Sequence, residues 1–226
     1  ERITHVFTTH THLDHSPLAH PLAEWAGAKV YGLPDPNVAH AEVSLEEDGE
    51  AGFKPDVLVK DGDLFSGPDW TLEAITTPGH MSNHVCYALK EENALFSGDH
   101  IMGWSTTVIS PPDGNMRQYF ASLDKIKARG FSTLWPTHGP PVTEVAPFID
   151  AYATHRRARE HSIVERMRAG DTLIPELVKV SYKDVDKRLH APAAHSVLAH
   201  VIQLVEEGRV IADGPLTLAT HYRLAV

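Results

Sequence analysis

The sequence HTHLDH, which begins at His10, places three imidazoles and one carboxylate within six positions. It follows the alternating apolar run of residues 3–8, which has the period of a β-strand. A strand that ends here would leave the motif at the carboxyl end of a sheet, where His10 and His12 can converge on one metal ion. Asp14 and His15 lie farther along and can face a second ion. Zinc favours such nitrogen and oxygen donors, so the motif predicts a metal centre; the alternative is a histidine-rich surface loop.

Further donors recur downstream, each directly after a predicted strand. They are His80 after residues 70–75, Asp99 after residues 94–96, and His138 after residues 133–135. Functional residues of layered α/β architectures lie in loops that rigid strands hold in place. This recurrence favours the metal centre over the surface loop.

One assignment uses all seven donors as two groups of three joined by a bridging carboxylate. The first group is His10, His12 and His80. The second group is Asp14, His15 and His138, and Asp99 is the bridge. We expect two zinc ions, with iron or manganese as alternatives. A hydroxide bridged by the two ions would attack the substrate, because two-metal sites activate water in this way. Asp14 would also be catalytic by orienting that hydroxide.

A serine or cysteine nucleophile is not expected. The single cysteine, Cys86, has apolar neighbours and no partner motif, and the sequence contains no Gly-x-Ser-x-Gly elbow. Direct hydrolysis at the metal centre is therefore the predicted chemistry.

The ordered donor set resembles the metallo-β-lactamase superfamily. Within it, the chain is similar to the β-lactamase-like-2 group, whose mitochondrial member is an endoribonuclease. The matching segments are TPGH at 77–80, ENALFSGD at 92–99, TTV at 106–108, PPV at 140–142 and HRxxRE at 155–160. The resemblance implies an αβ/βα sandwich that carries the metals at one edge, followed by a winged-helix-like tail.

Two domains are predicted, a catalytic α/β domain over residues 1–145 and a helical linker with a winged-helix-like domain over residues 146–226. The charge changes near this boundary. Residues 1–150 carry 9 Lys and Arg against 21 Asp and Glu, a net charge of −12, whereas residues 151–226 carry 11 against 9, a net charge of +2. Helices are expected over residues 17–26, 115–129, 146–168, 173–182 and 192–207, and a hairpin over 208–212 and 216–224.

Only nine residues precede His10, whereas several strands normally precede this motif in the superfamily. We therefore expect a sandwich that lacks some N-terminal strands, with residues 3–8 as an edge strand. An uncovered edge invites association, so a homodimer is possible. The helix over residues 17–26 is expected to carry Leu18, Leu22 and Trp25 on one side.

Several functions remain open from the sequence. The leading one is hydrolysis of a phosphodiester or ester-type bond. The others are a thioester or lactone hydrolase of the glyoxalase II type, a mononuclear iron persulfide dioxygenase, and a non-catalytic winged-helix binding module. The substrate would be single-stranded RNA or a small ester or thioester, and the net charge of −12 on residues 1–150 weakens the RNA interpretation.

Two further features of the sequence concern ligands. Met102 and Trp104 are candidates for a substrate pocket. The basic residues 155–168 either touch phosphate or clamp the tail to the catalytic half through Arg157 or Arg159.

The sequence also gives expectations about location. No apolar run approaches the ~20 residues of a membrane helix, so no membrane partner is expected. The single cysteine favours the cytoplasm, with an organelle or a lost targeting segment as alternatives.

Overall fold

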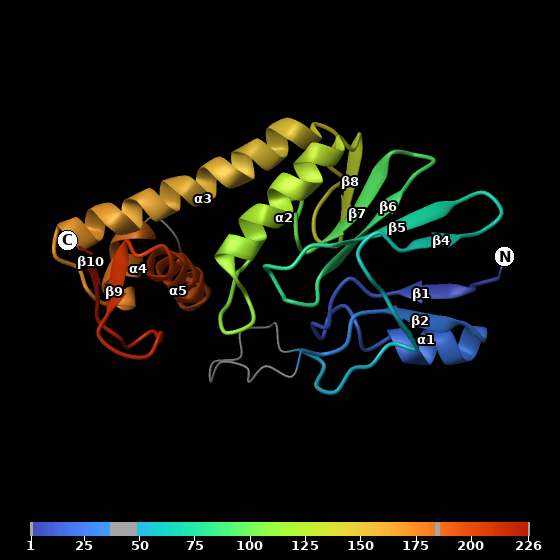
Figure 1. Ribbon diagram of the computed structural model, residues 1–226, viewed down its shortest axis with the longest axis horizontal. Helices are drawn as coiled ribbons and strands as arrows, with labels where there is room; N and C mark the ends of the chain where they lie inside the picture. Colours follow the sequence, from blue (N-terminus) through green and yellow to red (C-terminus); the bar gives the residue numbers. More distant parts are fainter. Residues whose placement is uncertain (1, 37–48, 184–185, 226) are drawn as a thin grey trace.

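The computed structural model describes residues 2–36, 49–183 and 186–225. Two sheets lie face to face between helical layers (Figure 1). In the described residues the first sheet has the parallel order β1 (His5–Phe7), β2 (Lys29–Gly32) and β3 (Val57–Leu58), and helix α1 (Ala19–Ala26) covers its outer face. The expected edge position of residues 3–8 is confirmed, since β1 pairs with β2 alone among the described strands.

The second sheet continues the chain in sequence order. Its strands are β4 (Leu64–Ser66), β5 (Thr71–Thr76), β6 (Val85–Leu89), β7 (Ala94–Gly98) and β8 (Thr133–Pro136). Neighbours from β4 to β7 are antiparallel, and β8 runs parallel to β7. Strands β5, β7 and β8 therefore end at the same edge of the sheet, which brings the residues that follow them together.

Aromatic side chains fill the space between the two sheets. Phe7 contacts the rings of Tyr31, Phe65 and Tyr87, with centroids 5.0–5.2 Å apart. Edge-to-face and tilted pairs at this separation add to the burial energy of each ring. The Tyr87 hydroxyl also donates to the Thr8 carbonyl at 2.9 Å, which fixes the end of β1 just before the histidine motif.

The outer face of the second sheet is covered by α2 (Met116–Arg129) and the first half of α3 (Val145–Arg168). Helix α2 begins where the side chain of Asn115 accepts a hydrogen bond from the Gln118 amide, 3.0 Å away, the arrangement of a helix cap. It buries Tyr119, Leu123 and Ile126 against the sheet. The sandwich thus has the expected αβ/βα layers.

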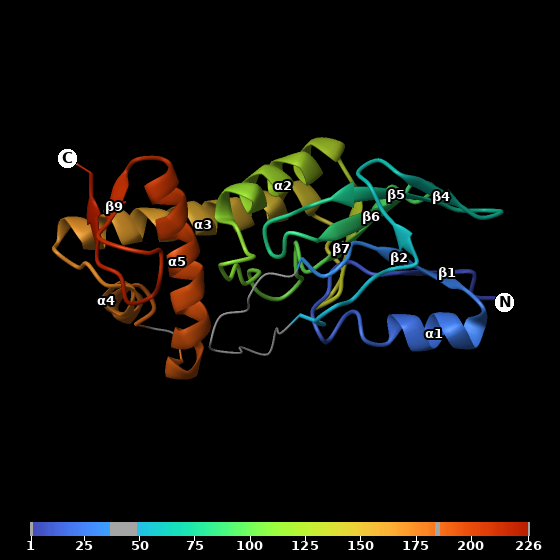
Figure 2. The ribbon, with the colours of Figure 1, turned by 60° about the horizontal axis from the view of Figure 1, so that its bottom comes forward.

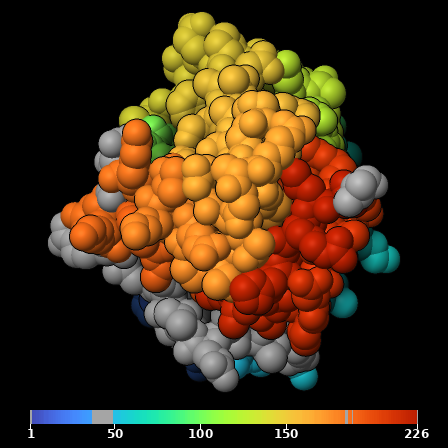
Figure 3. Space-filling view, turned by 90° about the vertical axis from the view of Figure 1, so that its left-hand side faces the viewer, coloured from blue at the N-terminus to red at the C-terminus, as the bar shows by residue number. Residues whose placement is uncertain are grey.

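The C-terminal part has its own apolar core. Its elements after α3 are α4 (Ile174–Ser181), a 3₁₀ turn (Lys187–Leu189), α5 (His190–Glu206), β9 (Val210–Ala212) and β10 (Tyr222–Leu224). Strands β9 and β10 form the expected antiparallel hairpin. Figure 2 shows this part beside the sandwich, and Figure 3, which faces this part, shows the gold and orange surface of α3 at its centre with the red last residues of the chain to its right.

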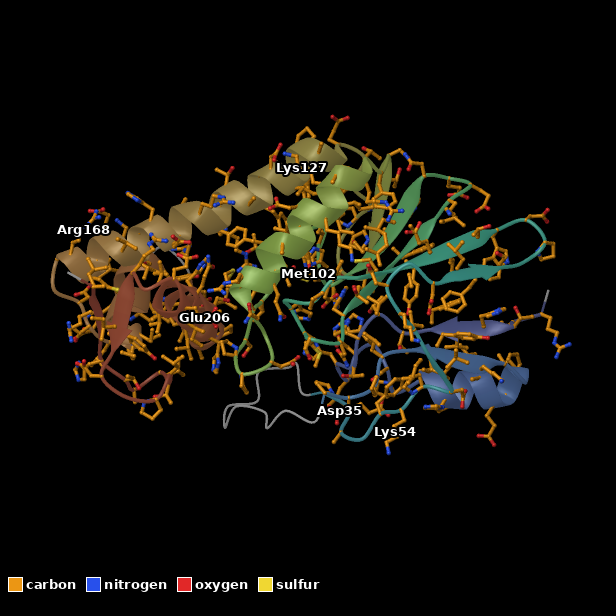
Figure 4. The ribbon with its side chains drawn as sticks, viewed as in Figure 1. Asp35, Lys54, Met102, Lys127, Arg168 and Glu206 are labelled. Carbon is orange, nitrogen blue, oxygen red and sulfur yellow. The ribbon has the colours of Figure 1, made fainter. Side chains whose placement is uncertain are left out.

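Helix α3 belongs to both cores. Ile149 and Tyr152 pack with the sandwich, whereas Ile163 and Met167 pack with the C-terminal core. A salt bridge of 2.9 Å between Arg117 of α2 and Glu206 of α5 adds a second link between the two parts (Figure 4). The exact boundary at residue 145 stays a prediction.

The first helix turns Leu18 and Trp25 to its exposed side. Leu18 and Trp25 are 70% and 80% exposed, and the buried face of α1 consists of Ala19 and Ala23. Small side chains on this face pack beside β1 and β2, and the larger side chains lie outside the core. None of the helices in the described residues is long and apolar enough to cross a membrane.

Candidate metal centre

The seven predicted donors converge at the edge where β1, β5, β7 and β8 end. The Val85 amide donates to the Thr9 carbonyl at 2.7 Å, which joins the histidine motif to the second sheet. His10, His12, His80 and Asp99 are buried, His15 and His138 are partly buried, and Asp14 is exposed. The centre is therefore enclosed by the sheets and opens to solvent on the side of Asp14.

The first group is formed by His10, His12 and His80. Nδ1 of His12 lies 3.0 Å from Nε2 of His10 and 3.1 Å from Nε2 of His80. Two nitrogens bound to one tetrahedral zinc would be about 3.3 Å apart, given zinc–nitrogen bonds of about 2.0–2.1 Å. The three nitrogens are thus spaced as donors to one shared ion would be.

The second group is formed by Asp14, His15 and His138. Oδ2 of Asp14 lies 3.3 Å from Nε2 of His15 and 3.1 Å from Nε2 of His138, and the two nitrogens are 3.4 Å apart. These three atoms are also spaced as donors to one ion. Nitrogen and carboxylate oxygen donors suit zinc and iron alike. The donor set therefore fits a metal ion but does not distinguish zinc from iron.

Asp99 lies between the two groups. Its Oδ2 atom is 3.9 Å from Nε2 of His80, 3.4 Å from Nε2 of His15 and 3.6 Å from Nε2 of His138. One carboxylate oxygen therefore faces donors of both groups. This is the position that a bridging ligand between two ions requires.

The pKa shifts of two donors, His10 and Asp99, suit metal binding, which needs neutral imidazoles and ionised carboxylates. Burial lowers the pKa of His10 well below 6.5, and the neighbouring imidazoles, beginning with His80, lower it further. Burial would raise the pKa of Asp99, but the hydrogen bond from His15 and the charges of His80 and His15 hold that pKa below its usual range.

Two donors are held by hydrogen bonds from outside the centre. Nδ1 of His80 donates to the Val108 carbonyl at 2.7 Å, so its Nε2 lone pair faces the other donors. The hydroxyl of Thr137 donates to Oδ1 of Asp99 and leaves Oδ2 toward the histidines. The sequence placed Thr137 beside His138 but gave no sign that it contacts Asp99, because that contact joins two strands.

His84 positions Asp99 from outside the donor set. It is fully buried, and burial lowers its pKa well below 6.5, so it is neutral. Its Nε2 accepts a hydrogen bond from the Asp99 amide at 3.1 Å, so its other nitrogen carries the proton and donates to Thr77 Oγ1 at 2.8 Å. The imidazole thereby fixes the backbone from which the candidate bridging carboxylate projects.

We expect His84→Ala to weaken metal binding roughly 10–100-fold, the usual loss when a group that orients a ligand is removed. The matched control is His161→Ala, which removes an imidazole that is 75% exposed on α3. Metal affinity is measured by competition with a chromophoric chelator, and folding by circular dichroism. Equal affinities in the two variants, both folded, would show that His84 only fills space.

The two pocket candidates lie in the loop after Asp99. The exposed Trp104 ring stacks beside the His138 imidazole, with centroids 5.9 Å apart and planes at 15°. Met102 is partly buried, and its carbonyl accepts a hydrogen bond from Tyr152 at 2.6 Å; Figure 4 places it between α2 and the sheet. Their role toward a substrate stays a prediction.

Comparison with known proteins agrees with this geometry. The description "Metallo-beta-lactamase superfamily" matches residues 1–138, and "Beta-lactamase associated winged helix domain" matches residues 174–215. Among solved structures, a beta-lactamase domain protein from Burkholderia ambifaria has a TM-score of 0.83 at 20% identity, covering 99% of this chain and 74% of its own. A metallo-beta-lactamase family protein from Thermus thermophilus has a TM-score of 0.80 at 20% identity, covering 99% and 80%. These two likenesses concern the fold alone.

Two curated relatives span most of this chain. The Caenorhabditis elegans "Beta-lactamase-like protein 2 homolog" is 30% identical over 84% of this chain and 61% of its own length. The "Atrochrysone carboxyl ACP thioesterase AgnL7" of Paecilomyces divaricatus is 27% identical over 92% of this chain and 64% of its own length. The chain thus spans less than two thirds of either relative.

The family match covers the sheets and the donors that converge at their edge, and the second match covers the C-terminal helices and β9. The chain therefore belongs to the metallo-beta-lactamase superfamily, whose members are generally metal-dependent hydrolases, and carries a beta-lactamase associated winged helix domain after the superfamily domain.

Proposed function

We propose that the chain is a dinuclear, zinc-dependent hydrolase of ester-type bonds, with thioesters and carboxylic esters as the favoured substrates. The observation that carries the proposal is Oδ2 of Asp99, which lies within 3.9 Å of His80 and 3.6 Å of His138. A carboxylate oxygen shared between two donor groups supports two ions instead of one. When bound, such ions lower the pKa of a water molecule and polarise the scissile bond.

Asp14 and Trp104 act where the centre opens to solvent. The Asp14 side chain is 50% exposed, and its carboxylate can accept a hydrogen bond from an attacking water while Oδ2 faces His138. The Trp104 ring, stacked beside His138, offers an exposed apolar wall for the acyl part of a substrate. Met102 is assigned to the same pocket by its place in the loop.

The choice of substrate class follows from charge and from one relative. Residues 1–150 carry a net charge of −12, which repels a polyanion such as RNA. The Paecilomyces divaricatus relative is named as a thioesterase. Both observations favour a thioester or ester over a phosphodiester as the substrate.

The test compares a thioester, a carboxylic ester and a phosphodiester as substrates of the zinc-loaded chain. We expect turnover of the thioester or ester, loss of that turnover with chelator, recovery on adding zinc, and two metal ions per chain by elemental analysis. Turnover that survives complete metal removal would contradict the mechanism.

Other results would identify the remaining candidates. Hydrolysis of the phosphodiester alone would support the RNA-type substrate. One iron per chain together with oxygen uptake on a persulfide would indicate a dioxygenase. A binding module would show no turnover, and its salt-dependent nucleic-acid binding would persist in Asp14→Ala.

A further inference from the structure

A cavity of about 240 Å³ lies where the C-terminal helices meet the loop of residues 105–108. Helix α3 and helix α5 form two of its walls, and Tyr182 closes part of a third. Its polar lining includes Thr107, His155, Arg156, Arg159, Ser196 and His200. None of these residues belongs to the metal centre, so the cavity is a separate feature of the fold.

Three side-chain nitrogens in this lining have no hydrogen-bond partner within the described part of the chain. They are Nε of Arg156, Nε of Arg159 and Nδ1 of His200. Arg156 is only 4% exposed and His200 only 1%. A buried polar group without a partner costs about 1–3 kcal/mol, and more when it is charged. The two arginine Nε–H groups among them can only donate, so they indicate a missing acceptor in the cavity.

The lining also carries positive charge that no described carboxylate neutralises. The two arginines donate to the carbonyls of Thr107 and Ser181, and their guanidinium groups lie over the rings of Tyr119 and Tyr182. Burial lowers the pKa of His200 to about 3, and the charges of Arg156 and Arg159 contribute. An anion in the cavity would offset this repulsion.

We propose that this cavity is a binding site for a phosphate group, held chiefly by Arg156, Arg159 and His200. A tetrahedral oxyanion presents several acceptor oxygens at once, and the planar guanidinium of arginine binds phosphate oxygens in pairs. The hydroxyl of Ser196 and the imidazole of His155 border the same space and can supply further hydrogen bonds. The site does not depend on the proposed hydrolase activity.

The loop of residues 105–108 connects this site to the metal centre. Its Thr107 carbonyl accepts from Arg156, while the Thr107 hydroxyl donates to the Asp99 carbonyl at 2.7 Å. The next carbonyl, that of Val108, accepts from His80 at 2.7 Å. A phosphate bound by Arg156 therefore braces the segment that holds two of the metal donors.

The test is calorimetric titration of the whole chain with inorganic phosphate, with metal and after chelation. Chelation removes phosphate binding at the metals and leaves binding in the cavity. We expect Arg159→Gln to weaken the remaining affinity by at least about tenfold, since a charged hydrogen bond contributes about 1.5 kcal/mol or more and each 1.4 kcal/mol is a factor of ten. Arg157→Gln is the control, because its exposed side chain lies over Phe120 and outside the cavity.

Further measurements identify the chemical form of the phosphate and check that each variant is folded. Methyl phosphate and dimethyl phosphate, used as competitors, distinguish a free ion, a monoester and a diester. Arg159→Lys keeps the charge and should retain part of the affinity, and circular dichroism checks the fold of each variant. Equal phosphate affinity in Arg159→Gln and Arg157→Gln, or no binding of any of the three probes to the chelated chain, overturns the proposal.

Discussion

The Asp99→Asn variant is expected to lose roughly a thousandfold in kcat/KM, the largest loss that we expect from one side chain. A bridging carboxylate supports both ions, and metal stabilisation of the reaction is worth several kcal/mol, with each 1.36 kcal/mol equal to a factor of ten in rate. Asparagine keeps the size of the side chain but removes its charge. Metal content should fall in parallel, because Oδ2 faces His80, His15 and His138.

Asp124→Asn is the control for this change. Asp124 lies exposed on α2, away from the donors, and its substitution makes the same chemical change at the surface. Activity on the best substrate and metal ions per chain are measured for both variants. An Asp99→Asn variant that binds two ions and keeps more than about a tenth of the activity would show that the carboxylate does not bridge.

The convergence of the candidate donors could be predicted from the sequence because these residues follow strands of recognisable period. Strands β5, β7 and β8 belong to one sheet and run in the same direction, so their carboxyl ends lie at the same edge. The motif that begins at His10 joins them through one contact, the Thr9 carbonyl with the Val85 amide. Position along the chain was therefore enough to bring His80, Asp99 and His138 together.

The supporting contacts could not be predicted in the same way. The Thr137 hydroxyl donates a hydrogen bond to Asp99, which is 38 positions away in the sequence. The Asp99 amide donates one to His84, which is 15 positions away. Neither spacing is a period of a helix or strand. The cavity that Arg156 lines likewise forms only when α3, α5 and the loop of residues 105–108 pack together.

The orientation of α1 shows a different limit of sequence patterns. Leu18 and Trp25 have the hydrophobicity of core residues, yet the structure buries Ala19 and Ala23 instead. Hydrophobic periodicity identifies an apolar stripe, but it does not say whether small or large side chains fit the gap above β1 and β2. The available space between helix and sheet decides this.

Gly79→Ala is expected to lower the free energy of unfolding by at least about 2 kcal/mol, because strained backbone and overpacking each cost about 1–3 kcal/mol. Gly79 has φ +142°, and a methyl group on it would lie 2.4 Å from Cα and 2.5 Å from the amide nitrogen of Tyr119. Its carbonyl also accepts from the Asn115 amide at 2.8 Å, at the start of α2. The methyl group must therefore displace either α2 or His80, the next residue, so activity should fall with stability.

Gly130→Ala separates the backbone strain from the clash. Gly130 ends α2 with φ +67°, and a methyl group there meets nothing within 4 Å. Its cost should be only the strain of a left-handed alanine, about 1–2 kcal/mol, with activity unchanged. Urea unfolding of both variants in chelator measures the two costs without the contribution of bound metal. Equal losses in both variants would mean that the loop before His80 can move away from α2, and the rigid placement of that donor would then be wrong.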